Sequence, residues 1–392
     1  MHAQPGSSKP LEAAAKYVDS PAGPDSMGSS LTTSPEGVTW LSWIESAGEK
    51  EQALKCARFD TASQRWSEAR LVARGADWFV NWADFPVMAA QGDRLTAVWF
   101  VGSSGGGHDH ASYHAEFSVS SDGGKTWGEP APVTPDSVSV EFVALQPLAN
   151  GRVLAAWLDG RNRHGDGMKD RQALYARIIG DPSPDVLVDP SVCDCCQLSL
   201  LATPDGALLA YRGRTAEEVR DMRVARYRND RWESPTALHN DGWKIAACPV
   251  NGPQLAASGQ HTGAIWFTAA NNQPRVYAAR FDPSASAFVG ALAIDLGRPL
   301  GRVDNAMLSD GAHLVVWLEG SDKEKEGGIY LRSISADGAL SRPALIAPTT
   351  TARAGGFPRI VLLRDGRQPQ LLLSFTRDGQ PRQVVTAVVT VN

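Results

Sequence analysis

The chain has 392 residues, a formal net charge of −5 and 21% charged residues. Because it contains no basic block, this balance argues against nucleic acid or an anionic membrane surface as its main partner. It contains no run of about 18 apolar residues, so we expect no membrane-spanning helix.

Residues 1–29 are rich in Ser, Pro, Gly and Ala, and we expect a flexible lead-in with one strand near Ala15 to Asp19. Beyond it, a short apolar strand that closes on an aromatic residue recurs along the chain. These aromatic residues are Trp43, Trp99, Trp157, Tyr211, Trp266, Trp317 and Phe375. The steps between them are 56, 58, 54, 55, 51 and 58 residues, which is a repeat period.

Each aromatic strand lies within a recurring unit of four strands. One strand precedes it, a strand of alternating pattern follows it, and a turn with a further short strand ends the unit. Four strands repeated radially predict an all-β propeller, here of seven blades with six as the alternative, forming a single domain over residues 30–392. The last unit ends after its third strand, so the N-terminal strand is expected to complete that blade and close the ring. A sandwich with irregular repeats is the other architecture considered.

One stretch carries a recognisable hairpin motif. Ser120-Ser121-Asp122-Gly123-Gly124-Lys125-Thr126-Trp127 matches the pattern S-x-D-x-G-x-T-W at every fixed position. In such a hairpin, Ser and Asp accept backbone N–H bonds and the glycines supply positive φ. The chain therefore resembles the sialidase-type propellers with Asp boxes (BNR repeats), and the resemblance covers nearly its whole length.

Several further motifs resemble those of a group of exported bacterial propellers often labelled exo-α-sialidase. They are W-L-D-G-R at Trp157 to Arg161, V-C-D-C-C-Q at Val192 to Gln197, Y-R-x-R at Tyr211 to Arg214, C-P-V-N-G-P at Cys248 to Pro253, G-R-V-D at Gly301 to Asp304, and a W-x-N-W-A-D-F-P variant ending at Pro86. The resemblance implies a periplasmic or secreted protein. The N-terminus lacks the charged and apolar regions of a signal peptide, so either the protein is cytosolic or its signal peptide has been removed. The resemblance to exported propellers favours the second alternative.

The resemblance to sialidases also implies a set of catalytic groups: three arginines that hold a substrate carboxylate, a Tyr nucleophile activated by a Glu, and an Asp acid/base. The motif F/Y-R-I-P that opens the sialidase site is absent from this sequence. The candidates that remain are Arg161, Arg212, Arg214 and Arg302, with Tyr211 and Asp84. They define one possible function, an exo-acting glycoside hydrolase that cleaves a carboxylated sugar.

Cysteines are concentrated at the entrances to two neighbouring blades. Cys193, Cys195 and Cys196 precede the inner strand of the fourth unit, and Cys248 precedes that of the fifth, so the two loops are expected to meet on one face near the axis. Three uses are open: a soft-metal site, a disulfide from Cys248 to one member of the triplet, and a thiol redox centre. Sulfur ligands and adjacent thiols favour copper, with zinc as the alternative.

Other candidates fall on the same face. His108 and His110 form a second possible metal site, although a solvated polar loop is the simpler interpretation. Trp82, Asn251 and Asp304 are candidate ligand-binding residues. The sequence thus predicts an exported propeller whose cysteine cluster binds a soft metal, most simply copper. The alternatives are the glycoside hydrolase and a ligand-binding propeller with structural disulfides, so whether the protein is an enzyme stays open.

Overall fold

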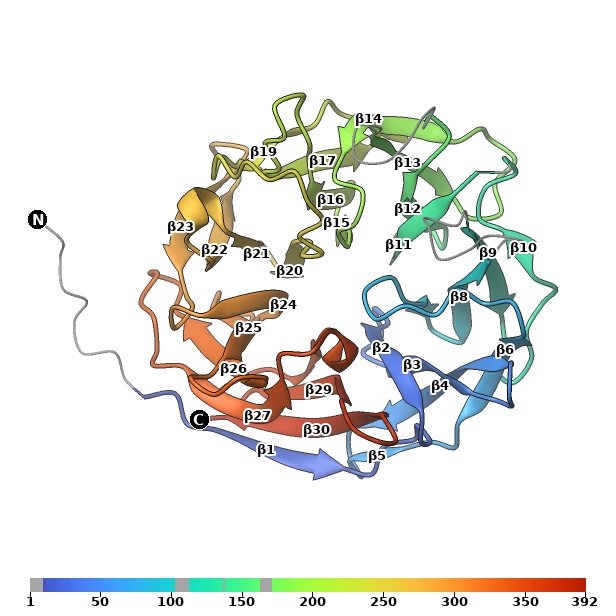
Figure 1. The fold of residues 1–392 in the computed structure, drawn as a ribbon, viewed down its shortest axis with the longest axis horizontal. Helices are drawn as coiled ribbons and strands as arrows, with labels where there is room; N and C mark the ends of the chain where they lie inside the picture. The colour runs from blue at the N-terminus through green and yellow to red at the C-terminus, as the bar shows by residue number, and fades with distance from the viewer. Residues whose placement is uncertain (1–9, 103–112, 137, 163–170) are drawn as a thin grey trace, which may run out of the picture.

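The computed structural model describes residues 10–102, 113–136, 138–162 and 171–392, and it is a ring of seven antiparallel sheets around a central axis (Figure 1). Each sheet has four strands along its path, with one further short outer strand in the first and fourth blades. The predicted seven-bladed propeller is therefore confirmed. Within the described residues, no helix is long and apolar enough to cross a bilayer.

The strands fall into four concentric sets. The inner strands are β2 (Ser26–Thr33), β7 (Val87–Gln91), β11 (Val140–Pro147), β15 (Ser199–Thr203), β20 (Gln254–Ser258), β24 (Pro299–Met307) and β28 (Arg359–Arg364). The second strands are β3 (Thr39–Ser46), β8 (Arg94–Gly102), β12 (Val153–Asp159), β16 (Gly206–Arg212), β21 (His261–Thr268), β25 (His313–Gly320) and β29 (Gln370–Arg377).

The third strands are β4 (Gln52–Asp60), β9 (Tyr113–Ser120), β13 (Gln172–Ile178), β17 (Met222–Arg228), β22 (Arg275–Asp282), β26 (Glu326–Ile334) and β30 (Gln383–Val391). The outer strands are β5 (Arg65–Trp66), β6 (Arg70–Gly75), β10 (Ala131–Pro132), β14 (Val186–Val192), β18 (Arg231–Trp232), β19 (Thr236–His239), β23 (Ala287–Ala293), β27 (Ala344–Thr350) and β1 (Ala13–Val18). Two short 3₁₀ turns, η2 (Ala270–Asn272) and η3 (Arg353–Gly355), lie between strands.

The ring is closed by the two ends of the chain, as predicted. Strand β1 runs antiparallel to β30, with Ala13 opposite Val391 and Val18 opposite Thr386. The last blade thus takes its outer strand from the N-terminus and its other three strands from the C-terminus (Figure 1). This pairing hydrogen-bonds what would otherwise be an exposed edge of β30.

The recurring aromatic residues form the contacts between blades. All seven are at most 2% exposed. Trp157, for example, packs with Val98 and Phe100 of the preceding blade. In three blades the indole Nε1 donates to a carboxylate two residues later, as Trp157 does to Asp159 at 2.8 Å. The sequence period therefore corresponds to one large, buried and hydrogen-bonded side chain per blade.

The Asp-box hairpin has the geometry that its sequence predicts. The amide N–H of Gly124 donates to Ser120 Oγ at 2.8 Å, and the N–H of Thr126 donates to Asp122 Oδ1 at 3.0 Å. Gly123 and Gly124 have φ angles of 71° and 80°, a region that favours glycine. The hairpin joins β9 to β10, the third and fourth strands of its blade. The Asp-box hairpin is thus a structural turn at the edge of its blade.

Candidate functional site

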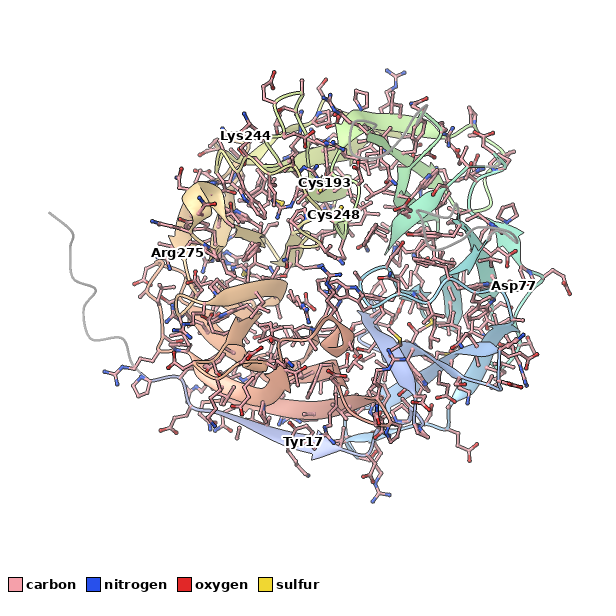
Figure 2. The ribbon with its side chains drawn as sticks, in the orientation of Figure 1. Tyr17, Asp77, Cys193, Lys244, Cys248 and Arg275 are labelled. Atoms are coloured by element: carbon pink, nitrogen blue, oxygen red, sulfur yellow. The ribbon has the colours of Figure 1, made fainter. Side chains whose placement is uncertain are left out.

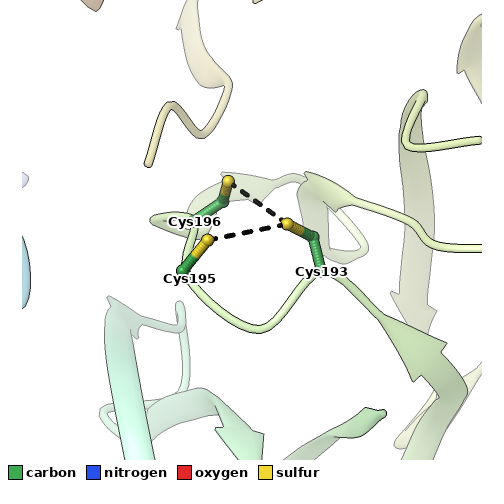
Figure 3. A group of neighbouring side chains, drawn as sticks. All are labelled: Cys193, Cys195 and Cys196. Carbon is green, nitrogen blue, oxygen red and sulfur yellow. Dashed lines mark hydrogen bonds between the residues drawn. The ribbon is translucent and has the colours of Figure 1, made fainter. Parts of the chain in front are cut away.

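Three cysteine thiols meet in the connection between β14 and β15. The Sγ atom of Cys193 lies 3.9 Å from that of Cys195 and 3.6 Å from that of Cys196 (Figure 3). All three Sγ atoms lie within 4.8 Å of one another. Cys193 and Cys196 are each 1% exposed, and Cys195 is half-buried. We call these three residues the cysteine cluster.

The loop that carries the cluster is fixed on both sides. The N–H of Cys193 donates to the carbonyl of Arg212 at 3.0 Å. Asp194 accepts the N–H of Gln172 through Oδ1 at 3.1 Å and the Nη1 of Arg214 through Oδ2 at 2.6 Å. The Asp194 carboxylate therefore ties the loop to the third and fourth blades at once. Rigid support of this kind holds metal ligands in a defined arrangement.

A guanidinium stabilises the innermost thiol in its charged form. Arg220 Nη1 lies 3.3 Å from Cys193 Sγ. Burial by itself raises the pKa of a thiol, but hydrogen bonds from Cys195 and Cys196 oppose it, as do the charges of Arg212 and Arg220. These effects outweigh burial, so the pKa of Cys193 lies well below its usual value. Cys193 is therefore the thiol of the cluster that loses its proton most readily.

The other two thiols keep their protons more tightly. Burial, followed by the hydrogen bond with Cys193, raises the pKa of Cys196 to about 12. Hydrogen bonds to Cys193, Cys196 and Cys248 raise the pKa of Cys195 well above its usual value. Cys248 is exposed, and its hydrogen bond with Cys195 lowers its own pKa. A metal ion would replace the protons of Cys195 and Cys196 when it binds.

The loop before β20 packs directly against the cluster loop, as predicted. Gln197 Oε1 accepts the N–H of Gly252 at 3.2 Å, while its Nε2 donates to the carbonyl of Ala83 at 2.9 Å. A side chain at Gly252 would place a Cβ only 2.0 Å from the carbonyl oxygen of Gln197, so glycine is required there. In the view of Figure 2, Cys193 and Cys248 lie in the same part of the ring.

The sulfur arrangement suits a soft metal ion. With metal–sulfur bonds of about 2.3 Å, three ligands in a plane are separated by roughly 4 Å. The two measured separations, 3.9 Å and 3.6 Å, are close to that value. All five cysteines lie within the described residues and carry free thiols. Cys56 is fully buried in β4, away from the cluster, and burial raises its pKa to about 12.

Three of the candidate arginines are already held by protein groups. Arg212, 1% exposed, donates to the carbonyls of Arg220, Asn251 and Phe267. Arg214 pairs with Asp194 and Glu218. Arg161 pairs with Asp136, Asp159 and Asp185, and its guanidinium lies over the ring of Tyr175.

Arg302 lies beside Trp82 and shares a partner, Asn251, with Arg212. Its Nη1 donates to the carbonyls of Ala352 and Gly356 at 2.9 and 3.0 Å. Its guanidinium carbon lies 4.9 Å from the centre of the Trp82 ring. Burial and the charge of Arg353 lower the pKa of Arg302 to about 10. Trp82 stacks on Phe357 and lines a surface pocket with Asn81 and Arg382.

Tyr211 and Asp84 are buried away from one another. Tyr211 is fully buried, and its hydroxyl donates to Asp189 Oδ2 at 2.6 Å. Asp84 accepts the hydroxyl of Tyr113 at 2.5 Å and the N–H of Phe142 at 3.0 Å. Burial raises the pKa of Asp84 well above its usual value. The N–H contact links the entrance of the second blade to the inner strand of the third.

Two candidate ligand-binding residues also join neighbouring blades. Asp304 accepts the N–H of Ile360 at 2.9 Å, which links β24 to β28. Asn251 accepts the N–H of Arg302 at 2.7 Å, which links the loop before β20 to β24. The structure therefore brings Cys193, Cys195, Cys196 and Cys248 together, while Asn251 and Asp304 form backbone contacts around the axis. His108 and His110 lie outside the described residues.

Two residues that the sequence did not single out support the cluster. Asp194 stands between Cys193 and Cys195, and this position inside the motif could have indicated that it supports the cluster. Arg220 is 27 residues from Cys193, and no spacing indicates that their side chains meet. The contact results from the turn after β16, which brings the chain back so that β17 can pair with that strand.

Comparison with known proteins gave similar solved structures only. Comparison with family models gave no match, and neither did comparison with curated proteins. Among solved structures, the chain is similar to the GH93 α-L-arabinofuranosidase of Fusarium graminearum in complex with arabinobiose, at 13% identity over 98% of both chains and a TM-score of 0.48.

It is also similar to the intramolecular trans-sialidase from Ruminococcus gnavus, at 8% identity over 93% of both chains and a TM-score of 0.45. The NanB sialidase from Streptococcus pneumoniae is 11% identical over 97% of this chain and 70% of its own, with a TM-score of 0.47. At these identities the likeness concerns the fold alone.

Proposed function

We propose that the cysteine cluster binds one Cu(I) ion and that the protein handles copper outside the cytoplasm. The observation that carries this proposal is the convergence of three Sγ atoms within 4.8 Å of one another on a loop whose innermost thiol contacts Arg220. Thiolates are the ligands that Cu(I) prefers. A metal-dependent activity on a small ligand is the other role such a site supports.

Charge and coordination number favour Cu(I) over Zn(II). Three thiolates and one Cu(I) ion carry a net charge of −2, which the buried guanidiniums of Arg220 and Arg212 offset. Structural zinc sites are almost always tetrahedral with four protein ligands. The fourth sulfur here belongs to Cys248, which is exposed and lies on a separate loop. Three sulfurs on one short loop therefore fit the lower coordination number of Cu(I) better.

Copper stoichiometry tests the proposal. Reduced protein is titrated anaerobically with Cu(I), desalted, and analysed for copper and free thiols. We expect one copper per chain, with Cys193, Cys195 and Cys196 protected from alkylation. Cys195→Ser combined with Cys196→Ser should abolish binding, and Cys56→Ala serves as the control because Cys56 lies in a different blade. Full copper content in the double variant would contradict the proposed site.

The glycoside hydrolase alternative has weaker support. Arg212 and Arg214 already bond to buried carbonyls and carboxylates, and Tyr211 is fully buried against Asp189. A substrate carboxylate would have to displace these contacts, and a nucleophilic Tyr would have to become accessible. Hydrolysis of fluorogenic sialosides or arabinofuranosides that disappears in Arg302→Ala would nevertheless establish this activity. We expect no such hydrolysis.

A further inference from the structure

Cys248 differs from the cluster in exposure but remains in contact with it. Its side chain is exposed, whereas Cys193 and Cys196 are each 1% exposed. Cys195 is half-buried, and Cys195 and Cys248 each affect the pKa of the other. The two loops are in direct contact, because the N–H of Gly252 donates to Gln197 Oε1 at 3.2 Å. The exposed Cys248 therefore lies on the loop next to a cluster whose Cys193 and Cys196 are buried.

The segment that carries Cys248 is anchored at both ends. The N–H of Ile245 donates to the carbonyl of Glu218 at 3.0 Å. The carbonyl of Asn251 accepts two bonds from the guanidinium of Arg212, at 3.2 and 2.8 Å. Between these points the chain is irregular, and Ala246 and Ala247 are exposed beside Cys248. Two methyl side chains leave the Cys248 sulfur open to an incoming group.

We propose that Cys248 is the exchange ligand through which Cu(I) passes between the cysteine cluster and a thiol-bearing partner. This inference rests on the proposed function of the cluster. The partner is defined by its chemistry as a molecule that presents a thiolate, either a small thiol or a protein with a Cys-x-x-Cys loop. A thiolate is required because it competes with the cluster for a soft ion.

The transfer is a ligand exchange without a change of oxidation state. Cys248 first forms a Cu–S bond as one of the three bonds to the cluster sulfurs breaks. Two incoming thiolates then form Cu–S bonds one after the other, each as one of the two remaining bonds to the cluster breaks, and the bond to Cys248 breaks last. When the incoming group arrives as a thiol, its proton passes to the sulfur that is released. Copper remains Cu(I) throughout, so the exchange needs neither an oxidant nor a reductant.

The test measures transfer kinetics separately from binding. Copper-loaded protein is mixed anaerobically with excess synthetic Cys-x-x-Cys peptide or, in a second arm, with glutathione. Rapid separation and elemental analysis then give the rate at which copper leaves the protein.

For the wild type we expect this rate to rise with the concentration of the thiol. Cys248→Ser should keep one copper per chain, and its rate should no longer depend on thiol concentration. Ala247→Ser is the matched control and should behave as the wild type.

Each outcome has a distinct meaning. A Cys248→Ser protein that keeps its copper and transfers it at the wild-type rate overturns the exchange role and leaves the copper site intact. A Cys248→Ser protein that no longer holds copper makes Cys248 a resident ligand and also overturns this role. A wild-type protein that binds no Cu(I) removes the proposed function, and this inference with it. Transfer to the peptide but not to glutathione would identify a protein dithiol as the partner.

Discussion

Arg220 Nη1 lies 3.3 Å from Cys193 Sγ at the buried end of the cysteine cluster. Arg220 is also 1% exposed and pairs with Glu218 at 2.8 Å. A charged donor in a site of low dielectric stabilises a thiolate strongly, because water is excluded. This contact distinguishes the cluster from a group of buried neutral thiols, and in the proposed copper site Arg220 would be a positioning and charge-balancing residue.

Replacing Arg220 should weaken copper binding without removing a ligand. In Arg220→Gln the thiolate of Cys193 loses its charged partner, so its pKa should rise towards the ordinary value. Loss of such a supporting group typically lowers metal affinity by about 10- to 100-fold. Competition with a chromophoric Cu(I) chelator measures the affinity, and Glu217→Gln, in an exposed neighbouring position, is the control. Equal affinity in both variants would contradict the role given to Arg220.

The thiols should react with iodoacetamide in an order set by exposure and pKa. Cys248 is exposed and its pKa is lowered by Cys195, so its thiolate forms at a lower pH than that of an ordinary cysteine. Its alkylation rate should rise with pH and then reach a plateau. The midpoint of this rise should lie below the usual cysteine value near 9. Cys56, with its pKa raised to about 12 by burial, should stay unmodified in the folded protein. Peptide mass mapping at several pH values checks this order.

Asp304 should contribute to stability and not to copper binding. Its Oδ2 accepts the N–H of Ile360 at 2.9 Å between the sixth and seventh blades. Asp304→Ala leaves that N–H unpaired at a buried position, which costs about 1 to 3 kcal/mol of unfolding free energy. Urea denaturation measures the loss, and copper content should be unchanged. Asp322→Ala, at an exposed ion pair with Arg298, is the control. Equal midpoints for the two variants would rule out the interblade role.

The fold was predictable because a large aromatic residue recurs once per blade and always packs between neighbouring blades. A buried Trp such as Trp157 or Trp317 packs each second strand against the neighbouring blade, so its period survives in the sequence. The closing strand was predictable from the repeat as well, because the last unit contained only three strands and needed a fourth from the N-terminus. Its bounds, Ala13–Val18, begin two residues before the expected start at Ala15 because lead-in residues pair with β30 through their backbone.

The site was only partly predictable. The spacing of Cys193, Cys195 and Cys196 placed them on one loop, and the repeat placed Cys248 on the next. The repeat did not reveal that Asn251 and Asp304 accept backbone N–H groups of other blades. Such contacts depend on strand bulges and turn geometry, which the residue types alone do not specify. For the same reason the contact between Arg220 and Cys193 becomes visible only in three dimensions.

The stability of the ring should fall in mild acid because of His313. This side chain is 1% exposed, and Asn305 Nδ2 lies 2.9 Å from its Nε2. Burial, followed by the charge of Arg280, lowers its pKa from 6.5 to about 3. The unfolded chain therefore binds a proton below about pH 6.5 that the folded chain does not bind until about pH 3. This stability is fully present above pH 6.5 and is lost as the pH falls through that window.

Between about pH 6.5 and pH 4.5, His313 should account for roughly 2 to 3 kcal/mol of lost unfolding free energy. Urea denaturation of the wild type and His313→Gln at several pH values measures this loss. The variant should show a shallower decline, because all other titrating groups are common to both proteins. His261→Gln, at an incompletely buried histidine, is the control and should keep the wild-type slope. Parallel declines for the wild type and His313→Gln would show that His313 is not the group responsible.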